Sequence, residues 1–306
     1  MKTSKNTFHH RSKLANRTNR LLARSALAAS FGLIAAGIPM LALAQSTSPW
    51  LPIPGSGSVG LSYASQRAGT AYIGDKNLPI SGITNGGAQR YDRSAYGLSL
   101  GYGLTDAVSL DASIGGGSVN VGAADKSSGQ TDTVLGANWR VLDEYESRGL
   151  PTVTLRAVAI VSGGNDGARL GALGKAAGGY GLSVVVGKQI GSAFRVWGGL
   201  GLEDRSKGVP NAVFIDLNAA YAVTPRISLS AGYTSKKFGG NLDIGGPGFS
   251  PALFQRVREE RETGRLGASY AIAGNQSVSL SLGKVFSGRN TVKDDQIIGL
   301  GYSYGF

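Results

Sequence analysis

The strongest constraint on this chain is an alternation of large apolar residues with glycine or serine at every second position. The chain ends on Ile-Gly-Leu-Gly-Tyr-Ser-Tyr-Gly-Phe, residues 298–306. A period of two residues is the signature of a β-strand with unlike faces. The pattern recurs along the chain, so we predict an all-β fold with about 12 strands, at 57–67, 93–104, 108–115, 131–141, 152–162, 179–190, 194–203, 212–223, 227–236, 264–273, 277–286 and 298–306.

The connections between these segments alternate strictly in length. Those at 105–107 and 191–193 are short, whereas those at 68–92 and 237–263 are long. In an antiparallel meander, this puts every short turn at one end and every long loop at the other. Bacterial outer-membrane barrels have this layout, with short periplasmic turns and long extracellular loops. We therefore predict a transmembrane antiparallel β-barrel over 57–306, preceded by a periplasmic segment at 45–56.

The non-apolar face of the strands distinguishes a membrane barrel from a soluble β-sandwich. A soluble protein carries charged residues on its solvent face, whereas glycine and serine dominate here, as in Gly299, Gly301 and Ser303. Small residues suit a confined interior, and the leucine, valine and tyrosine face then suits lipid. Backbone groups in lipid must all be paired, so the sheet has to close. A soluble sandwich is the alternative.

The first 44 residues have the features of a secretory signal peptide. They carry seven lysines and arginines and no acidic residue, followed by an apolar run and an Ala-x-Ala site at Ala42 and Ala44. We predict cleavage after Ala44; an uncleaved membrane anchor is the alternative. The formal charge of +12 falls to +5, because the other 24 basic residues exceed the 19 acidic ones by five. We therefore expect no nucleic-acid partner.

The predicted mature chain has few residues with catalytic chemistry. The two histidines, His9 and His10, lie in the signal peptide, and the sequence has no cysteine. Serine and cysteine nucleophiles paired with histidine are thereby excluded, and so are the usual zinc and haem ligands. We expect no enzymatic activity, no metal and no cofactor.

Two resemblances narrow the prediction. The ending with Tyr302, Tyr304 and Phe306 resembles the insertion signal of bacterial outer-membrane proteins. It implies assembly in the outer membrane with periplasmic chaperones and the barrel-assembly machinery, among lipid and lipopolysaccharide. Residues 50–52 (Trp-Leu-Pro), 55–63, 74–75 and 102–106 resemble a channel family linked to the meta-pathway of phenol degradation. That resemblance implies transport of aromatic compounds.

Several charged and aromatic residues fall at inward positions of the strands. These candidate pore-lining residues are Arg93, Asp111, Asp132, Arg140, Arg156, Arg195, Trp197, Glu203, Phe214, Asp216, Lys236 and Arg265. The charged ones either set ion selectivity or form salt bridges across a narrow lumen, and we expect a mixture. Arg156 projects into the lumen centre, with Asp111 and Asp216 as expected partners. Trp197 and Phe214 either contact an aromatic solute or pack against a glycine-rich wall.

The longest loop carries a helical pattern over 251–262, with Ser250 as the N-cap and Pro251 at the first position. This helix is predicted either to constrict the channel or to lie on the rim. The paired acids 259–260 and 294–295 are interpreted as solvated surface residues. A cation that bridges lipopolysaccharide is the alternative for 294–295.

The sequence supports three hypotheses of function. The first is an outer-membrane channel for passive diffusion of small solutes, with hydrophobic or aromatic compounds as candidates. The second is a non-conducting structural or adhesive barrel with a filled lumen. An outer-membrane enzyme is the third and is disfavoured, because barrel hydrolases generally use a catalytic histidine.

Overall fold

A computed structural model describes residues 48–306, except 123–124, 148, 165–166 and 168. The predicted signal peptide and its cleavage site lie outside the described residues. The strands that match the twelve predicted segments are β1 (Gly57–Ala68), β4 (Tyr91–Gly103), β5 (Val108–Val121), β7 (Thr133–Leu142), β8 (Thr152–Val161), β9 (Gly179–Ile190), β10 (Phe194–Arg205), β11 (Ala212–Ala222), β12 (Ile227–Phe238), β13 (Glu260–Ala273), β14 (Gln276–Arg289) and β16 (Gln296–Gly305).

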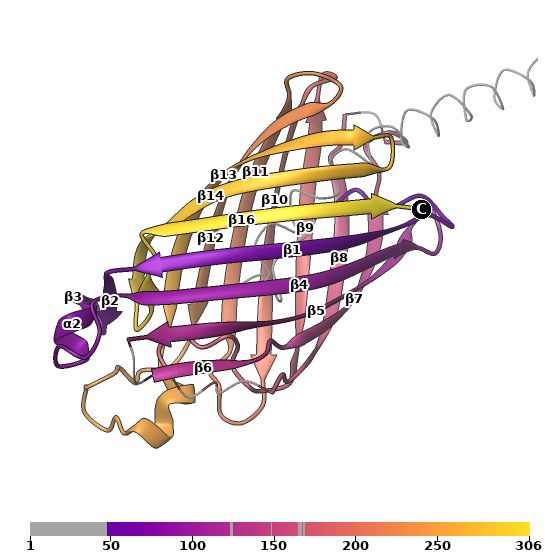
Figure 1. Ribbon diagram of the computed structural model, residues 1–306. Coiled ribbons are helices and arrows are strands. Elements are labelled where there is room, and N and C mark those ends of the chain that lie inside the picture. Colours follow the sequence, from indigo (N-terminus) through magenta and orange to yellow (C-terminus); the bar gives the residue numbers. More distant parts are fainter. Residues whose placement is uncertain (1–47, 123–124, 148, 165–166, 168) are drawn as a thin grey trace, which may run out of the picture.

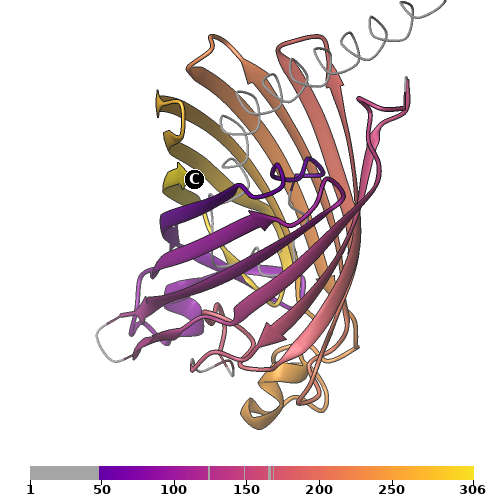
Figure 2. The ribbon, with the colours of Figure 1, turned by 90° about the vertical axis from the view of Figure 1, so that its right-hand side faces the viewer.

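These twelve strands form a closed antiparallel barrel (Figures 1 and 2). Each strand pairs with its neighbour in the sequence, and β1 pairs with both β4 and the last strand, β16. The pairing of β1 with the chain end continues one residue past β16, since Gly57 and Phe306 exchange backbone hydrogen bonds of 2.8 and 2.9 Å. The prediction of a 12-stranded all-β barrel is confirmed.

The two faces of the barrel wall differ as the alternation predicts. Large apolar side chains point outward, and residues such as Leu61, Tyr96, Leu202 and Leu266 are 55–67% exposed. Most residues between them are buried or half-buried inside the wall. An apolar outer band on a closed barrel is the surface that a lipid bilayer requires.

The two ends of the barrel differ in structure. At one end, tight turns join β4 to β5 and β11 to β12. The other end carries β2 (Thr70–Ile73), β3 (Lys76–Pro79), α2 (Ile80–Ile83), β6 (Asp125–Gln130), η2 (Pro251–Arg256) and β15 (Val292–Lys293). Strands β15, β2 and β3 form a small separate sheet there (Figure 1). In the described part of the chain, no helix is long and apolar enough to cross a membrane.

The prediction of a helix over 251–262 is wrong. A 3₁₀-helix covers only Pro251–Arg256, and the Ser250 side chain makes no capping hydrogen bond. Strand β13 begins at Glu260, where Glu260 and Arg261 pair with Lys237 and Lys236 of β12. Backbone pairing in the barrel therefore overrides the local helical pattern. It also makes β12 and β13 longer at this end than predicted.

Candidate functional site

The barrel lumen is the candidate site, because the predicted pore-lining residues project into it. All twelve of these side chains are buried or half-buried. The structure does not gather them at one level. It distributes them over three zones: the short-turn end, the middle of the lumen and the long-loop end.

The segment that precedes β1 packs inside the short-turn end of the lumen. The Trp50 ring meets Trp197 edge-on, at 5.9 Å between centroids. Its indole Nε1 donates to Glu144 at 2.8 Å, and the Arg195 guanidinium lies 5.1 Å from the Trp50 ring. The carbonyl of Pro49 accepts a 2.7 Å hydrogen bond from Thr154. The sequence predicted this segment as periplasmic, with no indication that it packs inside the barrel mouth.

In the middle of the lumen, Arg156 forms an ion pair with Asp111. Their Nη2 and Oδ2 atoms are 2.9 Å apart, and Asn138 bridges the pair by accepting from Arg156 at 3.0 Å and donating to Asp111 at 2.8 Å. A Cβ on Gly136 would lie 2.6 Å from Asp111, so glycine leaves room for the network. Asp216, the other expected partner, accepts a 2.7 Å hydrogen bond from Thr234.

An apolar cluster lies beside this ion pair. It contains Phe214 with Val134, Val158 and Ile160, all at most 7% exposed. Phe214 also covers Gly201 of the neighbouring strand β10. Arg140 lies near the short-turn end and pairs with Asp143 at 3.3 Å. Arg265 lies in the middle of β13 and contacts Asn218 at 3.4 Å.

The connection between β8 and β9 folds back into the lumen at the long-loop end. We call residues 169–178 the inward segment. Leu173 is 2% exposed and packs in an apolar core with Tyr91 and Val119. The carbonyl of Gly171 accepts hydrogen bonds from Tyr91 and from Arg93, the latter at 3.3 Å. Sequence reasoning missed this segment, because a loop without periodicity gives no indication of the wall it will contact.

An ion pair between Lys175 and Glu259 joins the inward segment to the residues just before β13. Glu259 also accepts a hydrogen bond from Thr291 at 3.1 Å. Burial raises the pKa of the Glu259 carboxyl, but Lys175, Arg261 and the Thr291 hydrogen bond together outweigh it, and the pKa lies below its ordinary value. The interpretation of Glu259 as a solvated surface residue is therefore wrong.

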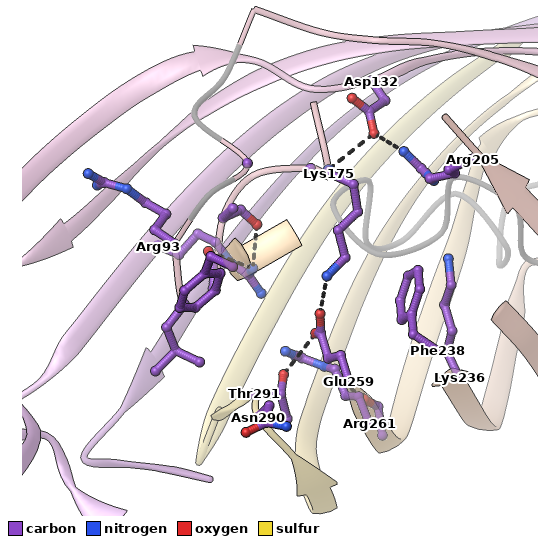
Figure 3. Close-up of a pocket in the computed structure, with 18 of the residues that line it drawn as sticks. Arg93, Asp132, Lys175, Arg205, Lys236, Phe238, Glu259, Arg261, Asn290 and Thr291 are labelled. Atoms are coloured by element: carbon purple, nitrogen blue, oxygen red, sulfur yellow. Dashed lines mark hydrogen bonds and ion pairs between the residues drawn. The ribbon is translucent and has the colours of Figure 1, made fainter. Parts of the chain in front are cut away.

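A pocket opens between the inward segment and the barrel wall (Figure 3). Its volume is about 900 Å³, part of which is open to the surrounding solvent. Among the described residues that line it, six are cationic and two acidic: Arg93, Arg169, Lys175, Arg205, Lys236 and Arg261, with Asp132 and Glu259. Phe238 and Phe254 add aromatic surface.

Buried carboxylates hold these cations in place by bridging two of them at a time. Glu203 pairs with Arg205 and, at 2.7 Å, with Lys236. Asp294 pairs with Arg261 and lies 3.5 Å from Arg93. Asp294 is fully buried, so its interpretation as a solvated residue is wrong: β15 and its flanks fold onto the barrel rather than into solvent.

Arg205 and Arg261 are pocket residues that the sequence analysis missed. Both lie just beyond the predicted ends of their strands, which are longer than expected. Continuing the alternation by two positions from Glu203 reaches Arg205, and by four back from Arg265 reaches Arg261. The alternating pattern therefore includes both arginines, but the predicted strand ends excluded them.

This architecture matches that of a solved outer membrane channel from Pseudomonas putida F1. The TM-score is 0.67 at 18% sequence identity, covering 86% of this chain and 98% of that chain. The chain has the fold of a 12-stranded outer-membrane barrel.

Other similarities are weaker. The NanC porin aligns with a TM-score of 0.49 at 11% identity, covering 80% of this chain and 98% of that chain. The translocator domain of the autotransporter NalP from Neisseria meningitidis aligns with 0.47 at 14%, covering 84% and 91%. No family model and no curated protein matches the sequence. At these identities, the similarity establishes the fold alone.

Proposed function

We propose that the protein is an outer-membrane channel for passive diffusion of small solutes. The observation that carries this proposal is the closed barrel itself, with an apolar outer face and a lumen that contains a charged central network and a basic pocket. Charged groups inside a water-filled barrel select solutes by their charge and size. The predicted pore-lining residues belong to this proposal.

Hydrophobic and aromatic compounds are the proposed solutes. Aromatic and apolar side chains lie inside the barrel, with Trp50 against Trp197 and Phe214 in its apolar cluster. The sequence resemblance to the phenol meta-pathway channels agrees with this class. We infer a passive role rather than a catalytic one, because the predicted mature chain lacks histidine and cysteine. Export by the signal peptide, then insertion by periplasmic chaperones and the barrel-assembly machinery among lipid and lipopolysaccharide, completes the proposal.

Single-channel conductance of residues 45–306 in a planar bilayer tests the proposal. We expect steady conductance from the native chain. Replacing Arg156 (Arg156→Ala) removes a cation and leaves Asp111 uncompensated, so ion preference should shift towards cations. Arg226→Ala is the matched control, because Arg226 is exposed in a short turn. A folded barrel that never conducts refutes the channel.

A non-conducting barrel is the second candidate, and two observations favour it. Trp50 fills part of the short-turn end of the lumen, and the Lys175–Glu259 pair anchors the inward segment at the other end. This structural role would be supported if the native chain does not conduct and if the chain without residues 48–54 does not conduct either.

A further inference from the structure

The pocket at the long-loop end has an excess of positive charge. Its six lining cations contact five carboxylates among the described residues, namely Asp125, Asp132, Glu203, Glu259 and Asp294. Arg93 and Arg261 share the single carboxylate of Asp294. The ion pairs therefore fix the geometry of the cations and leave one positive charge in excess.

An aromatic wall lies against two of these cations. The ammonium of Lys175 is 4.5 Å from the centre of the Phe238 ring, and that of Lys236 is 4.9 Å away. Figure 3 shows Lys236 running alongside Phe238, with Lys175 and Glu259 meeting beside them. Phe254 lines the same pocket from η2. Fixed cations next to an aromatic surface recognise an anion that carries an apolar ring, since the ring packs on phenylalanine while the charge meets the cations.

We propose that this pocket binds small aromatic carboxylates and selects them over uncharged aromatic compounds at the channel entrance. The inference rests on the proposed channel function and adds the class of solute. The carboxylate interacts with the excess positive charge at Arg93 and Arg261, beside Lys236, whose backbone pairs with Arg261 across β12 and β13. Its ring lies against Phe238. Burial of both groups in a partly enclosed pocket strengthens the charge interaction relative to bulk water.

Benzoate and benzyl alcohol are the matched probes, because they share a ring and differ in charge. Isothermal titration calorimetry on the detergent-solubilised native barrel measures binding without requiring conduction. We expect benzoate to bind at least about tenfold more tightly than benzyl alcohol, since charge-assisted hydrogen bonds are roughly twice as strong as neutral ones. Inorganic phosphate tests the anion alone, and it should bind more weakly than benzoate.

Three variants at two positions locate the site. Lys236→Gln keeps a donor for Glu203 but removes the charge, so benzoate binding should weaken about tenfold while benzyl alcohol is unaffected. Lys236→Arg should retain binding. Phe238→Leu should weaken benzoate and leave phosphate unchanged. Lys126→Gln, an exposed lysine on β6 at the same end of the barrel, is the charge-matched control.

The outcomes separate this inference from the channel proposal. Equal affinity for benzoate and benzyl alcohol, or an equal effect of Lys126→Gln and Lys236→Gln, overturns the pocket assignment. If the barrel conducts but shows no benzoate preference, the channel stands and the pocket proposal falls. If benzoate binds with the expected variant pattern but the barrel does not conduct, the pocket stands and the channel proposal falls.

Discussion

At the scale of single residues, glycine makes room for aromatic side chains of neighbouring strands. A Cβ on Gly116 would lie 2.7 Å from the Tyr96 hydroxyl, and one on Gly57 would lie 2.5 Å from the Phe306 ring. The same holds inside the lumen, where Phe214 covers Gly201. The sequence interpretation assigned glycine and serine to a confined interior. The structure shows that part of that space is already filled by rings.

The pair Gly201 and Phe214 gives a prediction at this scale. Gly201→Ala should destabilise the barrel by about 1–3 kcal/mol, because the added Cβ collides with the Phe214 ring and lies 2.7 Å from the Cβ of Ser183. Adding Phe214→Leu should restore much of the loss. Urea unfolding in lipid vesicles, followed by tryptophan fluorescence, measures both.

Gly274→Ala serves as the control for this pair. No neighbour lies within 4 Å of a Cβ at Gly274, so the change should stay within about 0.5 kcal/mol. If the double variant is no more stable than Gly201→Ala alone, the Phe214 ring is not what fills the space.

At the scale of elements, the inward segment is the part of the structure best placed to control passage. It is tied to the wall by the buried Leu173, by hydrogen bonds of its backbone to wall residues such as Asp132 and Arg205, and by the Lys175–Glu259 ion pair. Loop segments open at lower free energy than the strands that carry them. The Lys175–Glu259 pair is one of these contacts that a change of pH or a single substitution can remove.

Acid should release the inward segment. The pKa of Glu259 is depressed in the folded protein, so its contribution is present above the ordinary value of 4.5 and is lost as the pH falls through the lower folded value. Conductance should therefore rise below pH 4.5. Glu259→Gln should reproduce that rise at pH 7, and its conductance should change less with acid.

Hydrogen exchange of residues 169–178 provides a readout that is independent of conductance. Exchange should quicken in Glu259→Gln while the strands stay protected. Glu262→Gln, on the neighbouring strand β13, is the matched control. Unchanged exchange and conductance in Glu259→Gln would show that the ion pair does not hold the segment.

At the scale of the whole molecule, the barrel is closed by pairing the first strand with the last. Residues 58–67 of β1 pair with 296–305 of β16, and Phe306 continues the pairing onto Gly57. The chain end with Tyr302, Tyr304 and Phe306 therefore completes the closure seam. The role of this chain end as the assembly signal remains a prediction.

Phe306→Ala separates signalling from stability. We expect less folded barrel in the outer membrane of cells, because the assembly signal is impaired. Spontaneous refolding into lipid vesicles should change little, since the Phe306 side chain is 55% exposed. Phe286→Ala, another exposed aromatic residue on the outer face, controls for lost lipid contact. Equal losses for both variants in cells would refute a specific signal.

The sequence determined the fold class, the twelve strands and the outward face of each. The reason is that the alternation of a strand depends only on residues that are close together in the sequence. It also named Asp111, together with Asp216, as an expected partner of Arg156, since depth in the barrel follows from strand ends, and the structure pairs Arg156 with Asp111. Only the tertiary structure decided what fills the lumen. Trp50, the inward segment with Lys175, the half-buried Glu259 and the buried Asp294 belong to segments without a period. Their positions depend on contacts with distant strands, which local pattern does not encode.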